Sequence, residues 1–295
     1  MSPDRVPRAR AERAGGSAAP ADVPTDLDAL RRRIAALERR PPALENAAGG
    51  GRAGRPWAFG VGALDDALPE GGLAADGLHE AAGASAADGP AAAAFLAALL
   101  VRWVRARECD SERGTVLVCQ SRGGAARFGR LHGPGWRDLG LEPADLLILR
   151  ARREKDVPWA MEEGLRCGAL AAVLAEAEGI AFAVSRRLAL AAAEGATPAL
   201  LLRHDELGPA SAAQTRWRVA ALPGRADPFD EGAPGLPRWR LALVRVRGGR
   251  PATSDVEWNR ETGDFRLAAA LADRPAAPRA GTGAIPRRSR AAIGG

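Results

Sequence analysis

Short apolar runs alternate with longer helical segments through the middle of the chain. Runs of about five residues rich in Leu, Val and Ala have the length and character of strands that are buried on both faces. The candidate strands are residues 78–82, 115–120, 146–149, 170–175 and 198–203. The candidate helices are residues 64–68, a turn or two around Trp136, and residues 90–107, 157–167 and 181–194. Strands that alternate with helices predict right-handed βαβ crossovers and a mostly parallel sheet flanked by helices on both faces.

The last third of the chain changes to a period-two pattern, at residues 215–222, 238–248 and 254–259. In the middle segment Trp239 and Leu241 alternate with Arg238 and Arg240, and the alternation slips at Val244. This pattern predicts an antiparallel extension of the sheet with one solvent-exposed face. Two interpretations of its Arg and Trp side chains stay open: a stacking surface for a partner or a nucleic acid strand, or buried Trp with solvated Arg. The residues concerned are Arg216, Trp217, Arg218, Arg238, Trp239 and Arg240.

The two ends differ from the predicted α/β domain, which spans residues 56–270. Residues 1–55 are expected to form an arm with an amphipathic helix at about 25–40, followed by the flexible linker NAAGGGRAGRP. Leu30 and Ile34 belong to the apolar stripe of that helix, which must pack on the domain or on a partner because an isolated helix of this length is marginal. Residues 271–295 are rich in Pro, Gly and Ala and are predicted to be a disordered basic tail. Its Arg287, Arg288 and Arg290 are either solvated or contact a nucleic acid backbone.

Composition narrows the function classes. The 295 residues are 46% hydrophobic, enough for a substantial core, and the formal charge is +6, which permits contact with nucleic acid. No apolar run reaches the roughly 18 residues of a membrane span, and the N-terminus has no signal-peptide core, so a cytoplasmic location without membrane contact is expected. The three cysteines form no CxxC pair and are expected to be ordinary thiols. Three scattered histidines, His79, His132 and His204, indicate local structural roles rather than metal binding or catalysis.

The junction between the 78–82 strand and the 90–107 helix has the shape of a phosphate loop without its chemistry. Such a loop needs glycines, a Lys for the β- and γ-phosphates and a Ser or Thr for Mg²⁺. Gly83 and Gly89 are separated by five residues rather than four, and Pro90 and Ala91 stand where Lys and Ser or Thr would follow. Asp88 is expected to be the N-cap of the helix, where its carboxylate would repel phosphate. We therefore predict a nucleotide-binding scaffold that binds no nucleotide cofactor.

A count of lysines supports this prediction. Lys155 is the single lysine, so 41 of the 42 basic residues are arginine. Lys155 lies in RARREKD, far from any glycine-rich segment. No phosphate loop with its usual lysine exists in the sequence.

Residues 59–177 resemble the RecA family of recombinase ATPases in the order and spacing of several motifs. FGVGALDDALPEGGLAADGLHEAAG is similar to the start of the RecA core, and WAMEEGLRCGALAAVLAEA to the helix and strand with the Walker B carboxylate. The resemblance places the water-activating Glu at Ser121 and the Walker B acid at Glu176. The segments that correspond to the DNA-contacting loops are short, which implies weakened or lost filament binding.

A narrower resemblance covers roughly residues 57–267: the chain is similar to the ImuA family of bacterial damage-inducible mutagenesis operons. The motifs that carry it are LDDALPEGGL, LHEAAG, RARREKDVPWAMEEGLRCGALAAVLAE, SRRLALAAAEGATPALLLR, ASAAQTRWRVAALPG and PRWRLALVRVRGG. This resemblance implies a RecA-like fold with a degenerate Walker A loop and no catalytic activity.

The same resemblance implies an accessory role in SOS-induced, error-prone translesion DNA synthesis. The implied partners are ImuB, an inactive Y-family polymerase homologue, an error-prone replicative-type polymerase reached indirectly, and RecA. Direct contact with DNA is left open. Two alternatives also stay open: a degenerate RecA-type ATPase or DNA-binding protein, and a cell-division inhibitor of the SulA type.

Overall fold

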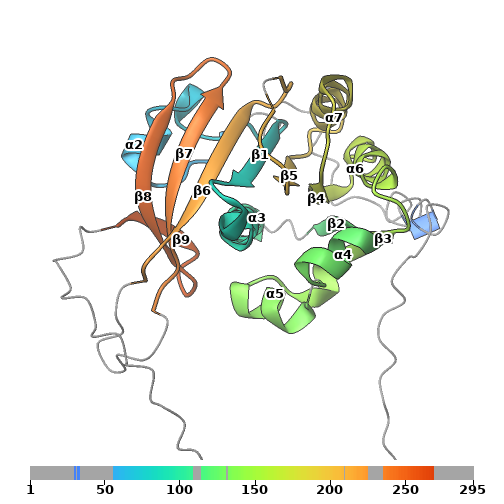
Figure 1. The fold of residues 1–295 in the computed structure, drawn as a ribbon, viewed down its shortest axis with the longest axis horizontal. Coiled ribbons are helices and arrows are strands. Elements are labelled where there is room, and N and C mark those ends of the chain that lie inside the picture. The colour runs from blue at the N-terminus through green and yellow to red at the C-terminus, as the bar shows by residue number, and fades with distance from the viewer. Residues whose placement is uncertain are drawn as a thin grey trace, which may run out of the picture.

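One nine-stranded sheet runs through the folded part of the chain, in the order β3-β2-β4-β5-β1-β6-β7-β8-β9 (Figure 1). The strands from β3 to β6 are parallel to their neighbours, and β6 to β9 are antiparallel. The predicted α/β class, a mostly parallel sheet flanked by helices with an antiparallel extension, is confirmed.

The computed structural model describes residues 30, 32–33, 56–108, 114–130, 132–208, 210–224 and 235–268. Within the predicted N-terminal helix, residues 30, 32 and 33 are helical, and Leu30 is fully buried among core residues of the domain. Most of the predicted arm and all of the predicted tail, with Arg287, Arg288 and Arg290, lie outside the described residues.

The predicted strands and helices correspond closely to the observed ones. The strands are β1 (Leu78–Gly83), β2 (Thr115–Ser121), β3 (Leu146–Ala151), β4 (Leu170–Ala177), β5 (Ala199–Arg203), β6 (Thr215–Leu222), β7 (Arg238–Val246), β8 (Ala252–Asn259) and β9 (Asp264–Leu267). The α-helices are α2 (Gly62–Asp65), α3 (Gly89–Glu108), α4 (Arg122–Phe128), α5 (Gly133–Leu139), α6 (Asp156–Arg166) and α7 (Phe182–Glu194). Three short 3₁₀ turns are η1 (Pro69–Gly71), η2 (Ala86–Asp88) and η3 (Pro143–Asp145).

Alternate side chains of the central strands enter two separate core clusters. In β2, Val116 and Val118 face the cluster that α3 completes, whereas Leu117 faces the cluster built with α6 and α7. Because strand side chains alternate between faces, apolar residues at every position are required where helices cover both sides. This explains the unbroken apolar runs in the sequence.

Helix α3 lies at the centre of the molecule against β1, β5 and β6 (Figure 1). The stretch Ala86–Arg107 is long and apolar enough to cross a membrane, but 56% of the relevant window is buried in the fold. A core helix of this length has the same composition, and α3 contributes Phe95, Leu96 and Leu99 to the core. Its apolar character is accounted for by packing.

The slip in the arginine-rich segment is a β-bulge. Trp217 of β6 pairs with Leu243, whereas Arg216 pairs with Arg245, so Val244 is the extra residue of β7. A bulge restores the alternation after one residue has shifted it. Trp239, Leu241 and Leu243 face the core before the bulge, and Val246 packs against the same cluster after it.

Candidate functional site

The loop after β1, at the carboxyl edge of the parallel strands, is closed around Asp88. Ligands of open α/β sheets bind at this edge. The carboxylate of Asp88 accepts hydrogen bonds from the Ser85 backbone N–H (3.1 Å) and hydroxyl (2.7 Å), and from the Ala221 backbone N–H of β6 (2.9 Å). The Asp88 side chain thus joins the start of the loop to β6 through three hydrogen bonds.

One sequence prediction about this loop needs correction. Asp88 is not the N-cap: Ser85 is the N-cap of η2, which runs directly into α3, and Asp88 is the third residue of that turn. The two side chains form a reciprocal capping box, because each accepts a hydrogen bond from the backbone of the other. The predicted electrostatic effect remains, since the carboxylate still lies at the positive end of the helical segment.

Hydrogen bonding keeps Asp88 ionised. The Ser85 hydroxyl, and after it the Ala221 N–H, lower the pKa of the Asp88 carboxyl below its ordinary value. The loop is also tight: a Cβ atom on Gly83 would lie 2.6 Å from the Ser85 carbonyl oxygen and 2.8 Å from the Gly89 nitrogen. Pro90 is the second residue of α3 and Ala91 is buried. An incoming phosphate would meet a negative charge and no cation from the loop.

The Walker-B-like residue Glu176 lies at the end of β4, where its carboxylate contacts side chains of the protein. Its Oε2 accepts a hydrogen bond from Gln120 Nε2 of β2 (2.9 Å) and lies 3.3 Å from His204 Nε2, at the end of β5. The His204 ring stacks on Phe128, with centroids 3.6 Å apart. Glu176 therefore contacts neighbouring side chains of its own edge, and β5 separates β4 from the loop of β1.

Ser121, where the resemblance places the water-activating Glu, has a structural role. Its hydroxyl accepts a hydrogen bond from the Gly124 N–H (2.7 Å) and caps α4. In the described ranges, no group of three or more His, Cys, Asp and Glu side chains is arranged to hold a metal ion. The hydroxyl at the position of the water-activating Glu is thus used as a helix cap.

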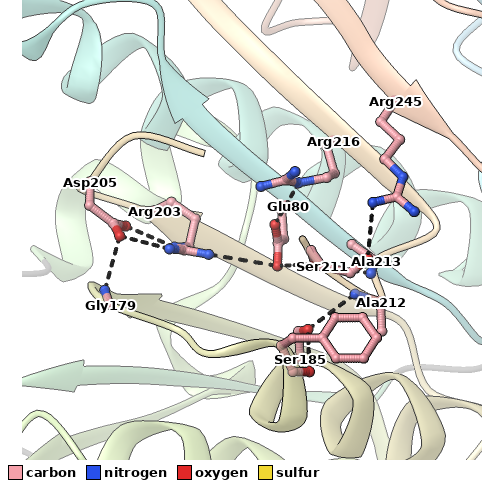
Figure 2. Close-up of polar contacts among 11 residues, drawn as sticks. Glu80, Gly179, Ser185, Arg203, Asp205, Ser211, Ala212, Ala213, Arg216 and Arg245 are labelled. Carbon is pink, nitrogen blue, oxygen red and sulfur yellow. Dashed lines mark hydrogen bonds and ion pairs between the residues drawn. The ribbon is translucent and has the colours of Figure 1, made fainter. Parts of the chain in front are cut away.

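A buried charge cluster that the sequence analysis missed lies beside this edge (Figure 2). Glu80, in the middle of β1, is completely buried and accepts hydrogen bonds from Arg216 Nε of β6 (3.0 Å) and from the Ser211 hydroxyl (2.7 Å). Arg203, at the end of β5, approaches the same carboxylate at 3.9 Å. A glutamate inside an apolar strand, LHEAAG, was the signal available in the sequence, but its arginines come from distant segments.

The same cluster and its neighbours form hydrogen bonds and ion pairs with the segment that connects β5 and β6. Arg203 forms a bidentate pair with Asp205 (2.8 and 2.7 Å), whose carboxylate also accepts from the Gly179 N–H (3.0 Å). On the other side, the Arg245 guanidinium donates to the Ser211 carbonyl oxygen (3.3 Å). Buried charges are tolerated where they are paired and hydrogen-bonded, as they are here. The arrangement holds the segment between β5 and β6 against β1.

The six residues of the candidate stacking surface do not lie together on the protein surface, because four are buried and two are exposed. Trp217 and Trp239 are 0% and 4% exposed and belong to the core on the α3 side, so neither is available to stack with a base. Arg216 and Arg238 are also buried, at 5% and 6% exposure. Of the six candidate residues only Arg218 and Arg240 are exposed, and Arg240 forms a bidentate pair with Asp255 (2.7 and 2.9 Å).

Comparison with known proteins gives a consistent answer. The chain is 36% identical over 235 residues to "Protein ImuA" of Caulobacter vibrioides, strain NA1000 / CB15N, an alignment that covers 74% of this chain and 91% of the relative. The ImuA protein of a second Caulobacter vibrioides strain, CB 15, matches with the same identity and coverage. No protein-family model matches the chain.

Proposed function

The chain belongs to the ImuA family, and from this premise we propose that it serves damage-inducible mutagenesis as a non-catalytic accessory protein with a RecA-like core. Its role is to bind other proteins during error-prone translesion DNA synthesis. The partner expected for such a protein is an ImuB-type inactive polymerase homologue, which connects it to an error-prone replicative-type polymerase, and RecA is a further candidate partner.

The observation that carries the proposal is the carboxylate of Asp88 in the loop after β1. Two backbone N–H groups and one hydroxyl bind it, as they would bind a phosphate oxygen in a nucleotide site. The positions for the phosphate Lys and the Mg²⁺ hydroxyl hold Pro90 and Ala91. Phosphoryl transfer relies on positioning and on charge stabilisation, and both are missing from this loop.

The network around Glu176 supports the same proposal. In a working site this acid would face Mg²⁺ through water, but here Gln120 and His204 contact it. Arg122 and Arg127 of α4 are the candidates to replace the lost lysine charge, and Arg127 is paired with Glu178 at 2.9 Å. Glu176 and Arg127 are therefore both bound to neighbouring side chains of the protein.

Equilibrium titration of the full chain with a fluorescent ATP analogue and Mg²⁺ tests the absence of nucleotide chemistry. We expect no saturable binding and a phosphate release rate equal to that of buffer. Glu176→Gln is the paired variant, and it should behave as the unaltered chain does. Hydrolysis by the unaltered chain that this substitution abolishes would instead establish a degenerate ATPase.

Co-purification tests the accessory role. The full chain is presented separately to the ImuB-type homologue, to RecA and to the division protein FtsZ, with and without residues after 271. A stable complex with the ImuB-type homologue is expected. Binding to FtsZ alone would replace the proposal with a SulA-like inhibitor of cell division.

A further inference from the structure

The antiparallel part of the sheet has two unlike faces. One carries Trp217, Trp239, Trp258 and Phe265 and packs into the core with α2 and α3. On the opposite face, no helix in the described part of the chain covers β6 to β9, and α2 lies behind these strands in Figure 1. We call this second surface the open face.

Arginine occurs in every cross-strand row of the open face. Directly opposed residues of antiparallel strands point to the same side of the sheet, so the strand register defines the rows. The rows are Arg216–Arg245, then Arg218–Ala242–Thr253, then Ala220–Arg240–Asp255, and finally Leu222–Arg238–Glu257–Arg266. Small side chains, Ala220, Ala242 and Thr253, lie between the arginines.

The open face has a surplus of positive charge. Arg216 is offset by the buried Glu80 (3.0 Å), so it adds no net charge. Arg238 is buried and lies 3.9 Å from Glu257, so this pair is set aside as well. The remaining arginines of the rows, Arg218, Arg240, Arg245 and Arg266, are exposed and face one carboxylate, Asp255, which leaves three positive charges in excess among the described residues. Arg218 and Arg266 are exposed, and the described residues provide no ion pair for either one.

The spacing of the rows suits a linear polyanion. Alternate residues of a strand lie about 6.6 Å apart, so consecutive rows are separated by about that interval, and their exposed arginines lie on β6, β7 and β9. A nucleic acid strand presents phosphates at short, regular intervals, and arginine binds phosphate well because its fork of N–H donors matches the oxygens. An acidic protein segment has no such obligatory regular spacing of charge.

We propose that the open face of β6 to β9 binds the phosphate backbone of a nucleic acid strand without reading its sequence. The tryptophans that would stack on bases lie on the core face, so contact is limited to the backbone. The site goes beyond the proposed accessory function, which requires only protein partners. Its exposed arginines are not among the groups that bind the Asp88 carboxylate.

The test compares two double variants of the full chain that carry the same net charge. Arg218→Gln with Arg266→Gln removes two exposed cations of the open face for which the described residues provide neither an ion pair nor a hydrogen bond to the side chain. Arg152→Gln with Arg186→Gln is the matched control, because both residues are exposed but lie after β3 and on α7. Any contribution of arginines outside the described residues is common to both proteins.

Fluorescence anisotropy with a labelled single-stranded oligodeoxynucleotide is measured over a range of salt concentrations, with a duplex of the same sequence in parallel. Each lost phosphate contact removes about 0.7 from the slope of log affinity against log salt for a single strand. The open-face variant should therefore bind on the order of 20-fold more weakly at about 0.1 M salt, with a slope shallower by about 1.4. The control should stay within about twofold of the unaltered chain. A larger effect on the duplex would assign the same surface to double-stranded DNA.

Three results would overturn the proposal. In the first, the full chain binds neither oligonucleotide at low salt. In the second, both double variants lose the same affinity, which would indicate a general charge effect. In the third, the open-face variant keeps its oligonucleotide affinity but no longer co-purifies with the ImuB-type homologue, which would assign the face to an acidic protein. None of these results depends on nucleotide binding, so the proposed absence of ATPase activity is judged separately.

Discussion

Asp88 combines two roles at the scale of one side chain: as the third residue of η2 it completes the capping box with Ser85, and it places a negative charge in the loop after β1. Replacing a capping residue by Ala typically costs about 0.5–2 kcal/mol, and Asp88→Ala should fall near about 1 kcal/mol because the carboxylate is partly exposed. The measurement is the urea midpoint of unfolding. Asp138→Ala, at an exposed site on α5, is the control and should change the midpoint little.

The same variant also tests whether the negative charge of Asp88 alone prevents ATP binding, or whether the missing Lys and hydroxyl do. Removing the carboxylate does not supply a Lys or a Mg²⁺-binding hydroxyl, so Asp88→Ala should not gain ATP affinity. Recovery of binding would mean that repulsion by Asp88 alone excludes the nucleotide.

His79 is held as a neutral ring inside the core. Its Nε2 lies 2.8 Å from the Ala74 carbonyl oxygen, which can only accept, so Nε2 carries the proton and Nδ1 accepts from the Thr215 hydroxyl (2.8 Å). Thr215 in turn accepts from Trp217 Nε1 (2.8 Å). Burial lowers the pKa of His79 from 6.5 to about 4. The histidine therefore has the local structural role that the sequence analysis expected.

This lowered pKa predicts a pH dependence of stability. Between pH 6.5 and about 4 the unfolded chain binds a proton at this residue and the folded chain does not. Stability from His79 is thus fully present above the unfolded pKa and is lost as the pH falls, by on the order of 3 kcal/mol. The free energy of unfolding, followed from pH 7 to pH 4, should fall less steeply in His79→Gln. His132→Gln, at an exposed site, should keep the original slope.

At the scale of elements, Glu80 and Arg216 connect β1 to β6 where the sheet changes from parallel to antiparallel pairing. Removing one charge of a buried pair leaves the other unpaired, which costs about 3–5 kcal/mol. Glu80→Gln should destabilise the fold by that amount in chemical denaturation. Asp255→Asn, which breaks the more exposed pair with Arg240, should cost less than about 1 kcal/mol. Equal effects would show that burial of the Glu80 pair adds nothing.

The strands could be predicted because helices cover both faces of the parallel region and leave continuous apolar runs in the sequence. Two elements were missed. Helix α4 has the sequence RGGAARF, and its two glycines lower helix propensity, so the Ser121 cap decides its start. Strand β9 has four residues, too few to establish a period of two, and pairing with β8 defines it.

The candidate site could be predicted where chemistry is local in sequence. Pro90 and Ala91 were identified from their positions beside Gly89, but the partnership of Asp88 with Ser85 and Ala221 depends on the path of the loop. The Glu80 cluster joins residues 80, 203 and 216, which the strand order brings together. Whether Trp217 and Trp239 are buried or exposed also depends on tertiary packing, because the period-two pattern alone does not say which face of the sheet is exposed to solvent.

At the scale of the whole molecule, the two core clusters are the opposite faces of shared strands. Leu200 and Leu202 of β5 face the α3 cluster, whereas Leu201 between them faces the cluster with α6 and α7. If the helices on one face of the sheet detach, the strands they cover are exposed to solvent. The helices on the other face pack against the same strands, so they lose support as well. The described domain should therefore unfold as one cooperative unit.

Leu201→Ala tests this coupling, because it removes packing from the α6 and α7 side alone and should cost about 2–5 kcal/mol. Trp57, Trp217, Trp239 and Trp258 belong to the α3 cluster, so they are the main source of tryptophan fluorescence from that side. If the sheet unites the layers, fluorescence and far-UV circular dichroism must show the same lowered midpoint in thermal unfolding. A variant in which helical signal is lost first, while the fluorescence midpoint stays unchanged, would mean that the two layers melt independently. The shared strands, with side chains entering both clusters alternately, are the physical reason to expect a single transition.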